Sequence, residues 1–150
     1  MDNHVSGDTN NNTVDALDRA DGPGVSFVEA VYRGFRVRAQ RHPRGGHWCG
    51  YITVLTAHPW AVAACTAEDG TSTAPCEARL MGVMNVHGGC TYAEILGGGI
   101  TVGFDCAHFS DGPPPWMPER ASWGGTYRDL AYVREQLLSL AEQAEQAADG

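Results

Sequence analysis

Apolar and polar residues alternate in the first third of the chain and predict a β-hairpin. Between Phe35 and Gln40 the alternation has the period of a strand with one buried face. Residues 43–46, Pro-Arg-Gly-Gly, supply a turn, and residues 47–56 return as a second strand rich in β-branched and aromatic residues. One face of this second strand should carry Trp48, Gly50, Ile52 and Val54, and the other Cys49, Tyr51, Thr53 and Leu55.

The middle of the chain predicts more strands separated by glycine turns. Residues 83–87 and 91–96 have strand character around Gly88-Gly89, a dipeptide that tolerates the positive φ of a tight hairpin turn. Residues 100–107 form another expected strand, which Pro113-Pro114-Pro115 follows as a rigid connection. The segment from Ala57 to Pro75 has no sustained period and predicts a surface loop with at most one short turn.

The last predicted element is an amphipathic helix that begins after Thr126. Its apolar stripe has a period of 3.6 residues and consists of Leu130, Val133, Leu137, Leu140, Ala141 and Ala144. The economical fold is therefore α+β, with an antiparallel, meander-like sheet of about five strands covered by this C-terminal helix. One domain over residues 25–150 suits the chain length, and the Asn- and Asp-rich residues 1–24 are expected to form a disordered acidic tail.

Composition narrows the class of protein. No apolar run approaches the roughly 20 residues of a membrane helix, and the N-terminus lacks the basic-then-apolar pattern of a signal peptide, so a cytoplasmic protein without a membrane partner is expected. Five cysteines without a C-x-x-C pair argue against a disulfide framework and a zinc ribbon. The net charge of −8 argues against general nucleic-acid binding.

The basic residues are all arginines, and half of them are concentrated on the predicted hairpin. Arg36 and Arg38 belong to a run without an intervening acid that comprises Arg33, Arg36, Arg38, Arg41 and Arg44. These arginines can bind a small anionic molecule, and Arg36 and Arg38 are the candidate binding residues. The alternative is a solvated hairpin face.

Candidate chemistry lies at the ends of the predicted strands, where a turn leaves side chains accessible while the sheet fixes them. In the segment His87 to Tyr92, Gly88 and Gly89 can bring backbone N–H groups close to a ligand oxygen beside the His87 imidazole, with Tyr92 as a further ligand-binding residue. In the segment from residue 103 to Asp111, strand alternation separates Asp105 from Phe104, Cys106 and His108. Acid–base catalysis by His87 and Asp105 needs fewer assumptions than metal or thiol chemistry, and His108 and Asp111 are further catalytic candidates.

Other chemistries remain open at the same residues. His58, directly after the second strand, is a further candidate ligand, with a surface or capping role as its alternative. Cys106 and His108 together with His87 and Cys90 offer ligands of the kind zinc accepts, although the spacing is not a known signature. A Cys nucleophile paired with His87 is weaker, because neither Cys49 nor Cys106 lies at an evident helix N-terminus that would lower its pKa. No particular metal or cofactor is predicted.

Four motifs resemble those of small uncharacterised proteins from tailed bacteriophages and actinobacteria. They are His-Gly-Gly-x-Thr-Tyr at 87–92, Gly-Phe-Asp-x-Ala-His-x-x-Asp at 103–111, Cys-Gly-Tyr at 49–51 and Tyr-Arg-Asp-Leu-x-Tyr-Val at 127–133. The likeness spans roughly residues 31–145 without the 61–80 loop, and Gln136 departs from it at a position that is Glu in those proteins. The resemblance implies a shared site at His87, Tyr92, Asp105, His108 and Asp111 and leaves its chemistry open.

Three functions fit these observations. The first is a small hydrolase of a phosphorylated or nucleotide-like molecule, with His87 or His108 as general acid or base oriented by Asp105 or Asp111. The second is a non-catalytic binding protein, such as a phage-type nucleotide sponge or an inhibitor of a host protein with an anti-defence role. The third is a structural or host-interaction module, in which the polar residues are satisfied turn groups.

Overall fold

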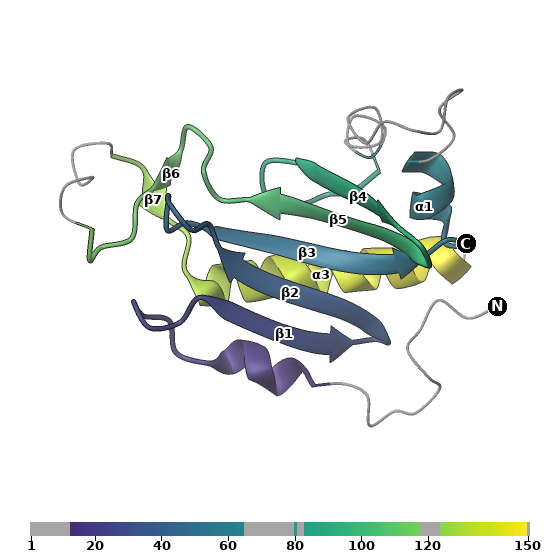
Figure 1. Ribbon diagram of the computed structural model, residues 1–150, viewed down its shortest axis with the longest axis horizontal. Coiled ribbons are helices and arrows are strands. Elements are labelled where there is room, and N and C mark those ends of the chain that lie inside the picture. Colours follow the sequence, from purple (N-terminus) through teal and green to yellow (C-terminus); the bar gives the residue numbers. More distant parts are fainter. Residues whose placement is uncertain (1–12, 65–79, 81–82, 118–123, 150) are drawn as a thin grey trace.

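A five-stranded sheet and one long helix across its face form the protein, shown by a computed structural model in Figure 1. The structure describes residues 13–64, 80, 83–117 and 124–149. The sheet contains β1 (Phe27–Tyr32), β2 (Phe35–Arg41), β3 (Trp48–Leu55), β4 (Tyr92–Leu96) and β5 (Gly99–Asp105). The other elements are the 3₁₀ helix η2 (Val14–Asp18), the helices α1 (Pro59–Ala64) and α3 (Leu130–Asp149), and the short parallel pair β6 (Asp111–Gly112) and β7 (Thr126–Tyr127).

The α+β prediction is confirmed: the sheet is antiparallel throughout and the C-terminal helix packs on it. The first three strands follow one another in space, and the predicted hairpin is β2 and β3, with Val37 opposite Ile52. The order then becomes β3-β5-β4, so β4 forms an edge and β5 returns between it and β3. The C-terminal end of β5 therefore lies beside the start of β3, next to the β2–β3 turn.

Helix α3 covers the sheet with the predicted stripe, because its buried residues are the six apolar ones named above. Its first backbone amides are capped by Asp129, whose Oδ1 accepts a 2.9 Å hydrogen bond from the Tyr132 N–H. The helix approaches β3 closely at Gly50, where an added Cβ would lie 2.4 Å from the Phe104 ring and 3.1 Å from Leu137. The predicted alternation of β3 is also confirmed, with its even-numbered residues buried under α3.

The segment before β4 departs from the expected strand. Residues 83–87 form no strand, because their polar backbone groups bond to side chains of α3 instead of a neighbouring strand. Gln136 Oε1 accepts from the His87 amide at 2.8 Å, and Gln143 bonds both the N–H and the carbonyl of Asn85. The Gly88-Gly89 turn has the expected positive φ angles of 69° and 80°, but it joins this segment to β4 and not two paired strands.

Two boundary predictions need correction. Residues 13–24, assigned above to a disordered tail, belong to the folded part: Leu17 of η2 is 1% exposed, and Thr13 covers the edge of β1 through two hydrogen bonds with Val31. Residues 1–12 lie outside the described residues. The expected surface loop starts as helix α1, and its residues 65–75 lie outside the described part of the chain.

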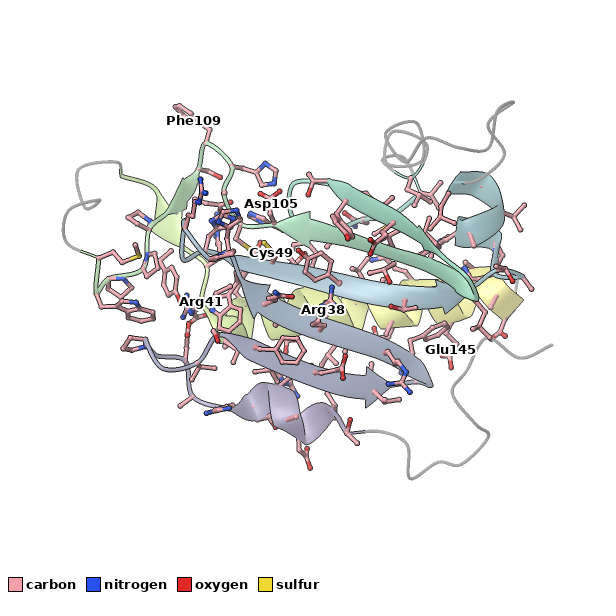
Figure 2. The ribbon with its side chains drawn as sticks, in the orientation of Figure 1. Arg38, Arg41, Cys49, Asp105, Phe109 and Glu145 are labelled. Atoms are coloured by element: carbon pink, nitrogen blue, oxygen red, sulfur yellow. The ribbon has the colours of Figure 1, made fainter. Side chains whose placement is uncertain are left out.

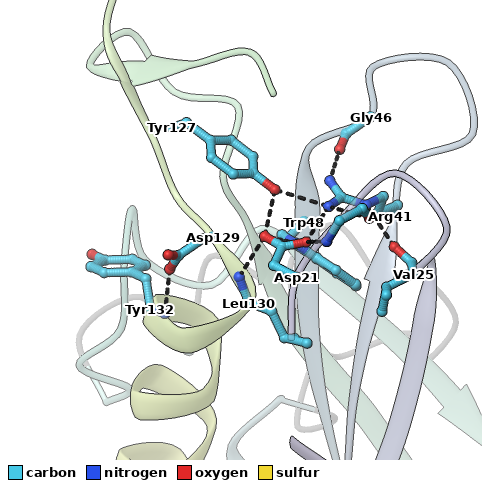
Figure 3. A network of polar contacts seen from close by, with 10 residues as sticks. Asp21, Val25, Arg41, Gly46, Trp48, Tyr127, Asp129, Leu130 and Tyr132 are labelled. Atoms are coloured by element: carbon cyan, nitrogen blue, oxygen red, sulfur yellow. Dashed lines mark hydrogen bonds and ion pairs between the residues drawn. The ribbon is translucent and has the colours of Figure 1, made fainter. Parts of the chain in front are cut away.

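Asp21 connects four parts of the fold that are far apart in sequence, as Figure 3 shows. Its Oδ2 accepts hydrogen bonds from the Tyr127 hydroxyl at 2.7 Å, the Leu130 amide at 3.0 Å and the Trp48 indole at 3.3 Å. Its Oδ1 forms an ion pair with Arg41, whose guanidinium stacks over the Trp48 ring at 4.3 Å. These residues, the Asp21 cluster, hold the start of α3 and strand β7 against the end of β2 where the candidate site begins.

None of the helices in the described part of the chain combines the length and apolarity that crossing a membrane requires.

Candidate functional site

Four segments meet beyond the C-terminal end of β5. They are the β2–β3 turn, the glycine turn at 88–89, the segment from Asp105 to Pro113, and the start of α3. Figure 2 labels Asp105 and Cys49 at this end of the sheet and Phe109 at the tip of the adjoining loop. The meeting of these segments brings His87, Asp105, His108 and Asp111 into one region, as their hydrogen bonds and the 3.5 Å contact between His108 and Asp105 show.

Asp111 is the buried centre of this region, with a side chain that is 1% exposed. Its Oδ2 accepts from the His108 amide and from His87 Nε2, both at 2.9 Å, and its Oδ1 accepts from Arg128 Nε at 2.9 Å. Burial alone would raise the pKa of Asp111, but the hydrogen bonds from His87, Arg128 and the His108 amide hold it below its usual value. The carboxylate is thus ionised, and it organises its neighbours instead of serving as a free base.

Both ring nitrogens of His87 are engaged. Because Nε2 faces the Asp111 carboxylate, it carries the proton, and Nδ1 accepts a 2.7 Å hydrogen bond from the Tyr132 hydroxyl. The His87 side chain is only 10% exposed. These contacts hold the His87 ring in place beside Asp111, and the acid–base role expected of His87 stays a prediction.

His108 is more accessible than His87, with a side chain that is 32% exposed. Its Nε2 is buried, has no hydrogen-bond partner among the described residues, and lies 3.5 Å from Asp105 Oδ1. Asp105 is itself oriented by the Thr91 hydroxyl at 2.9 Å and the Ala107 amide at 3.1 Å. The arrangement is an imidazole beside a fixed carboxylate, which is the form a general acid or base takes in many hydrolases.

A cavity of about 430 Å³ lies in front of His108. The β2–β3 turn contributes Arg44, Gly45 and His47, and the loop after β5 contributes Cys106, Ala107, His108, Phe109, Asp111, Gly112 and Pro113. Asp111 is the one carboxylate among these lining residues, and its charge is already paired with Arg128. Arginine and imidazole side chains around such a cavity provide the donors that bind a phosphate or carboxylate group.

The thiols near the cavity are unsuited to nucleophilic attack. Burial raises the pKa of Cys49 to about 11, and burial together with the nearby Asp111 raises the pKa of Cys106 further. Both thiols are thus protonated at neutral pH. For zinc, no three His, Cys, Asp or Glu side chains in the described part of the chain are placed to hold a metal ion.

Several predicted ligand residues lie elsewhere. His58 is 0% exposed: its Nε2 bonds the Ala144 carbonyl near the end of α3, and its Nδ1 accepts from the Trp60 amide at the start of α1. Arg36 and Arg38 lie on the face of the sheet opposite α3, outside the cavity, where Arg38 stacks over Tyr51 at 4.5 Å. The Gly89 amide donates to the Val86 carbonyl, so it does not reach toward a ligand.

Other site residues were not predicted. Tyr132 and Gln136 are spaced four residues apart, so they lie on one face of α3, and Arg128 precedes this helix. That polar row could have indicated contacts with the site. His47 begins the second strand of the predicted hairpin, and nothing in its local sequence distinguishes it from a surface residue.

Gly88 has a specific role beneath His108. Its φ is 69°, and an added Cβ would lie 2.0 Å from His108 Nε2. We therefore expect Gly88→Ala to displace the His108 ring and to destabilise the turn by about 1–3 kcal/mol. Comparing the His108 imidazole NMR signal in this variant and in Gly89→Ala measures the effect, since a Cβ at Gly89 meets nothing within 4 Å. If the His108 signal does not change in Gly88→Ala, the His108 ring does not lie against Gly88.

Comparison with known proteins returned no match: no family model, no curated protein and no solved structure corresponds to this chain. The likeness to phage and actinobacterial proteins stays a prediction.

Proposed function

We propose that the protein is a small hydrolase of a phosphorylated small molecule, with His108 as its general acid or base. The observation that carries the proposal is the accessible His108 imidazole, which lies 3.5 Å from a fixed carboxylate and faces a cavity lined by Arg44 and His47. His108 lies next to His87 in a T-shaped contact with ring centroids 5.6 Å apart. His87 and Asp111 hold the loop that carries His108, so the acid–base group starts in a defined position.

Each group has a distinct role in this proposal. Arg44 and His47 bind the anionic group, and Asp105 stabilises the protonated imidazole that forms when His108 takes a proton from water. The water oxygen attacks the phosphorus atom, and His108 returns the proton to the oxygen of the leaving alcohol. Asp111 and His87 act through His108 and touch no substrate atom.

A second function, binding without turnover, has an observation in its favour. Cys49 and Cys106 are poor nucleophiles, and the Asp111 carboxylate is fully engaged by its three donors. A phage-type sponge or an inhibitor of a host protein would need the same cavity but no activated nucleophile. Denaturing the loaded protein separates the two functions, because a sponge releases its ligand unaltered and a hydrolase releases the products.

Arg44→Ala tests the anion site. We expect this variant to weaken binding of inorganic phosphate about tenfold or more, since a charged hydrogen bond contributes about 1.5–3 kcal/mol. Arg36→Ala is the matched control, because Arg36 is an exposed arginine of the same hairpin outside the cavity. Calorimetry with phosphate measures both variants, and phosphate release from aryl phosphates and nucleoside monophosphates is followed in parallel. Equal phosphate affinity in the two variants would contradict the proposal that the cavity binds phosphate through Arg44.

A further inference from the structure

A second cavity, of about 260 Å³, adjoins the first on the open face of the sheet. It is lined by His42, His47, Cys49, Tyr51, Thr91, Tyr92, Phe104, Asp105 and Ala107. His47 and Ala107 line both cavities, and the contact between Asp105 and His108 lies where the two cavities adjoin. A ligand whose anionic group occupies the first cavity can therefore extend past His108 into the second.

Aromatic rings border this second cavity from two directions. Tyr51 and Tyr92 meet edge to face with centroids 5.1 Å apart, because both are paired with Gly103 of the strand between them. An added Cβ at Gly103 would lie 2.6 Å from the Tyr51 ring, so only glycine lets the two rings approach over β5. The β2–β3 turn contributes His42 and His47. Their rings stack with centroids 4.9 Å apart and an angle of 15° between the ring planes.

Polar groups also reach this cavity. The Asp105 carboxylate, 31% exposed, and Thr91 form part of its lining, where they can bond the ring nitrogens and exocyclic groups of a heterocycle. The Arg38 guanidinium is not part of the lining, but it lies against the Tyr51 ring that is. Walls of flat rings with a few convergent polar groups are typical of sites for planar heteroaromatic molecules.

We propose that this second cavity is a subsite for the planar base of a nucleoside monophosphate, whose phosphate occupies the first cavity. The inference rests on the proposed function, which it makes more specific by naming the substrate class. The ring inserts beside Tyr92 and the stacked imidazoles, and the phosphoester bond then lies at His108. The negative net charge of the chain fits a single nucleotide better than a nucleic-acid strand, because one phosphate needs only the local donors of the first cavity.

Calorimetry with four probes tests the subsite: inorganic phosphate, ribose 5-phosphate, a nucleoside and the matching nucleoside 5′-monophosphate. We expect the monophosphate to bind about tenfold or more tightly than ribose 5-phosphate, since base stacking on an aromatic side chain contributes about 1–3 kcal/mol. Tyr92→Ala should remove this gain and leave the affinity for phosphate unchanged. Tyr92→Leu keeps apolar bulk without the ring and should behave in the same way. Phe27→Ala, an exposed aromatic residue on β1 outside both cavities, should change nothing.

The outcomes separate the two proposals. Equal affinities for ribose 5-phosphate and the monophosphate would overturn the subsite and leave the anion site standing. Tyr92-dependent binding of the nucleoside without any phosphate binding would support the subsite and overturn the anion site. Binding of none of the four probes would overturn both.

Discussion

Replacing Asp21 by alanine is expected to lower the free energy of unfolding by about 3–5 kcal/mol, the usual cost of removing one partner from a buried ion pair. The Asp21 and Arg41 side chains are 15% and 8% exposed, so water cannot replace the lost carboxylate around the guanidinium. The substitution also leaves the Leu130 amide at the start of α3 and the Trp48 indole without their acceptor. Urea unfolding followed by tryptophan fluorescence and circular dichroism measures the change.

Asp15→Ala is the matched control, because Asp15 is an exposed carboxylate of η2 in the same N-terminal segment. It should change the free energy of unfolding by less than about 0.5 kcal/mol, as surface substitutions usually do. If Asp21→Ala lowers the free energy of unfolding no more than Asp15→Ala does, the stabilising role of Asp21 is contradicted.

The Asp21 cluster also makes stability depend on pH. Burial alone would raise the pKa of Asp21, but hydrogen bonds from Tyr127, Leu130 and Trp48 and the charge of Arg41 hold it below the ordinary 3.8. Because the pKa is lower in the folded state than in the unfolded state, the contribution of Asp21 is present above about pH 3.8 and is lost as the pH falls through the lower folded value. The difference between the native protein and Asp21→Asn should therefore shrink in acid.

Replacing His108 by alanine is expected to lower the rate of phosphoester hydrolysis by about 10²–10⁴-fold, the usual contribution of a general acid or base. His108 is a third exposed and lies in a loop, so the variant should stay folded. Added imidazole should restore part of the rate by entering the space that the side chain vacates. Kinetics on an aryl phosphate that the native protein hydrolyses provide the measurement.

Two variants separate the direct role of His108 from support by its neighbours. Asp105→Asn should lower kcat more than it changes KM, because Asp105 stabilises the charged imidazole and not the bound phosphate. Asp111→Asn should lower both stability and rate, since it disturbs His87, Arg128 and the His108 backbone at once. Unchanged turnover in His108→Ala would end the hydrolase proposal and favour binding alone.

Local patterns were sufficient to predict much of the fold. The β2–β3 hairpin and the buried stripe of α3 follow from short-range alternation and period, which depend only on neighbouring residues. The segment before β4 was wrongly expected to be a strand because its partners, Gln136 and Gln143, lie 49 and 58 residues away from the groups they bond. Long-range side-chain bonds of this kind override a local preference and leave no periodic signal.

The site was predictable in composition but not in geometry. His87, Asp105, His108 and Asp111 drew attention as polar residues at strand ends and turns, yet their roles depend on distance. Only the fold shows that both ring nitrogens of His87 have hydrogen-bond partners and that the His108 side chain is a third exposed. Asp21 was placed in the acidic tail because its segment is polar, whereas its interactions join it to residues more than 100 positions later.

Imidazole NMR spectra recorded during a titration with inorganic phosphate test the central claim most directly. The cavity between the β2–β3 turn and the loop after β5 should bind phosphate, so the signals of His47 and His108 should shift in a saturable way. The signal of His58, buried at the other end of α3, should stay in place. Unmoved signals of His47 and His108, or shifts no larger than those of His58, would contradict the account.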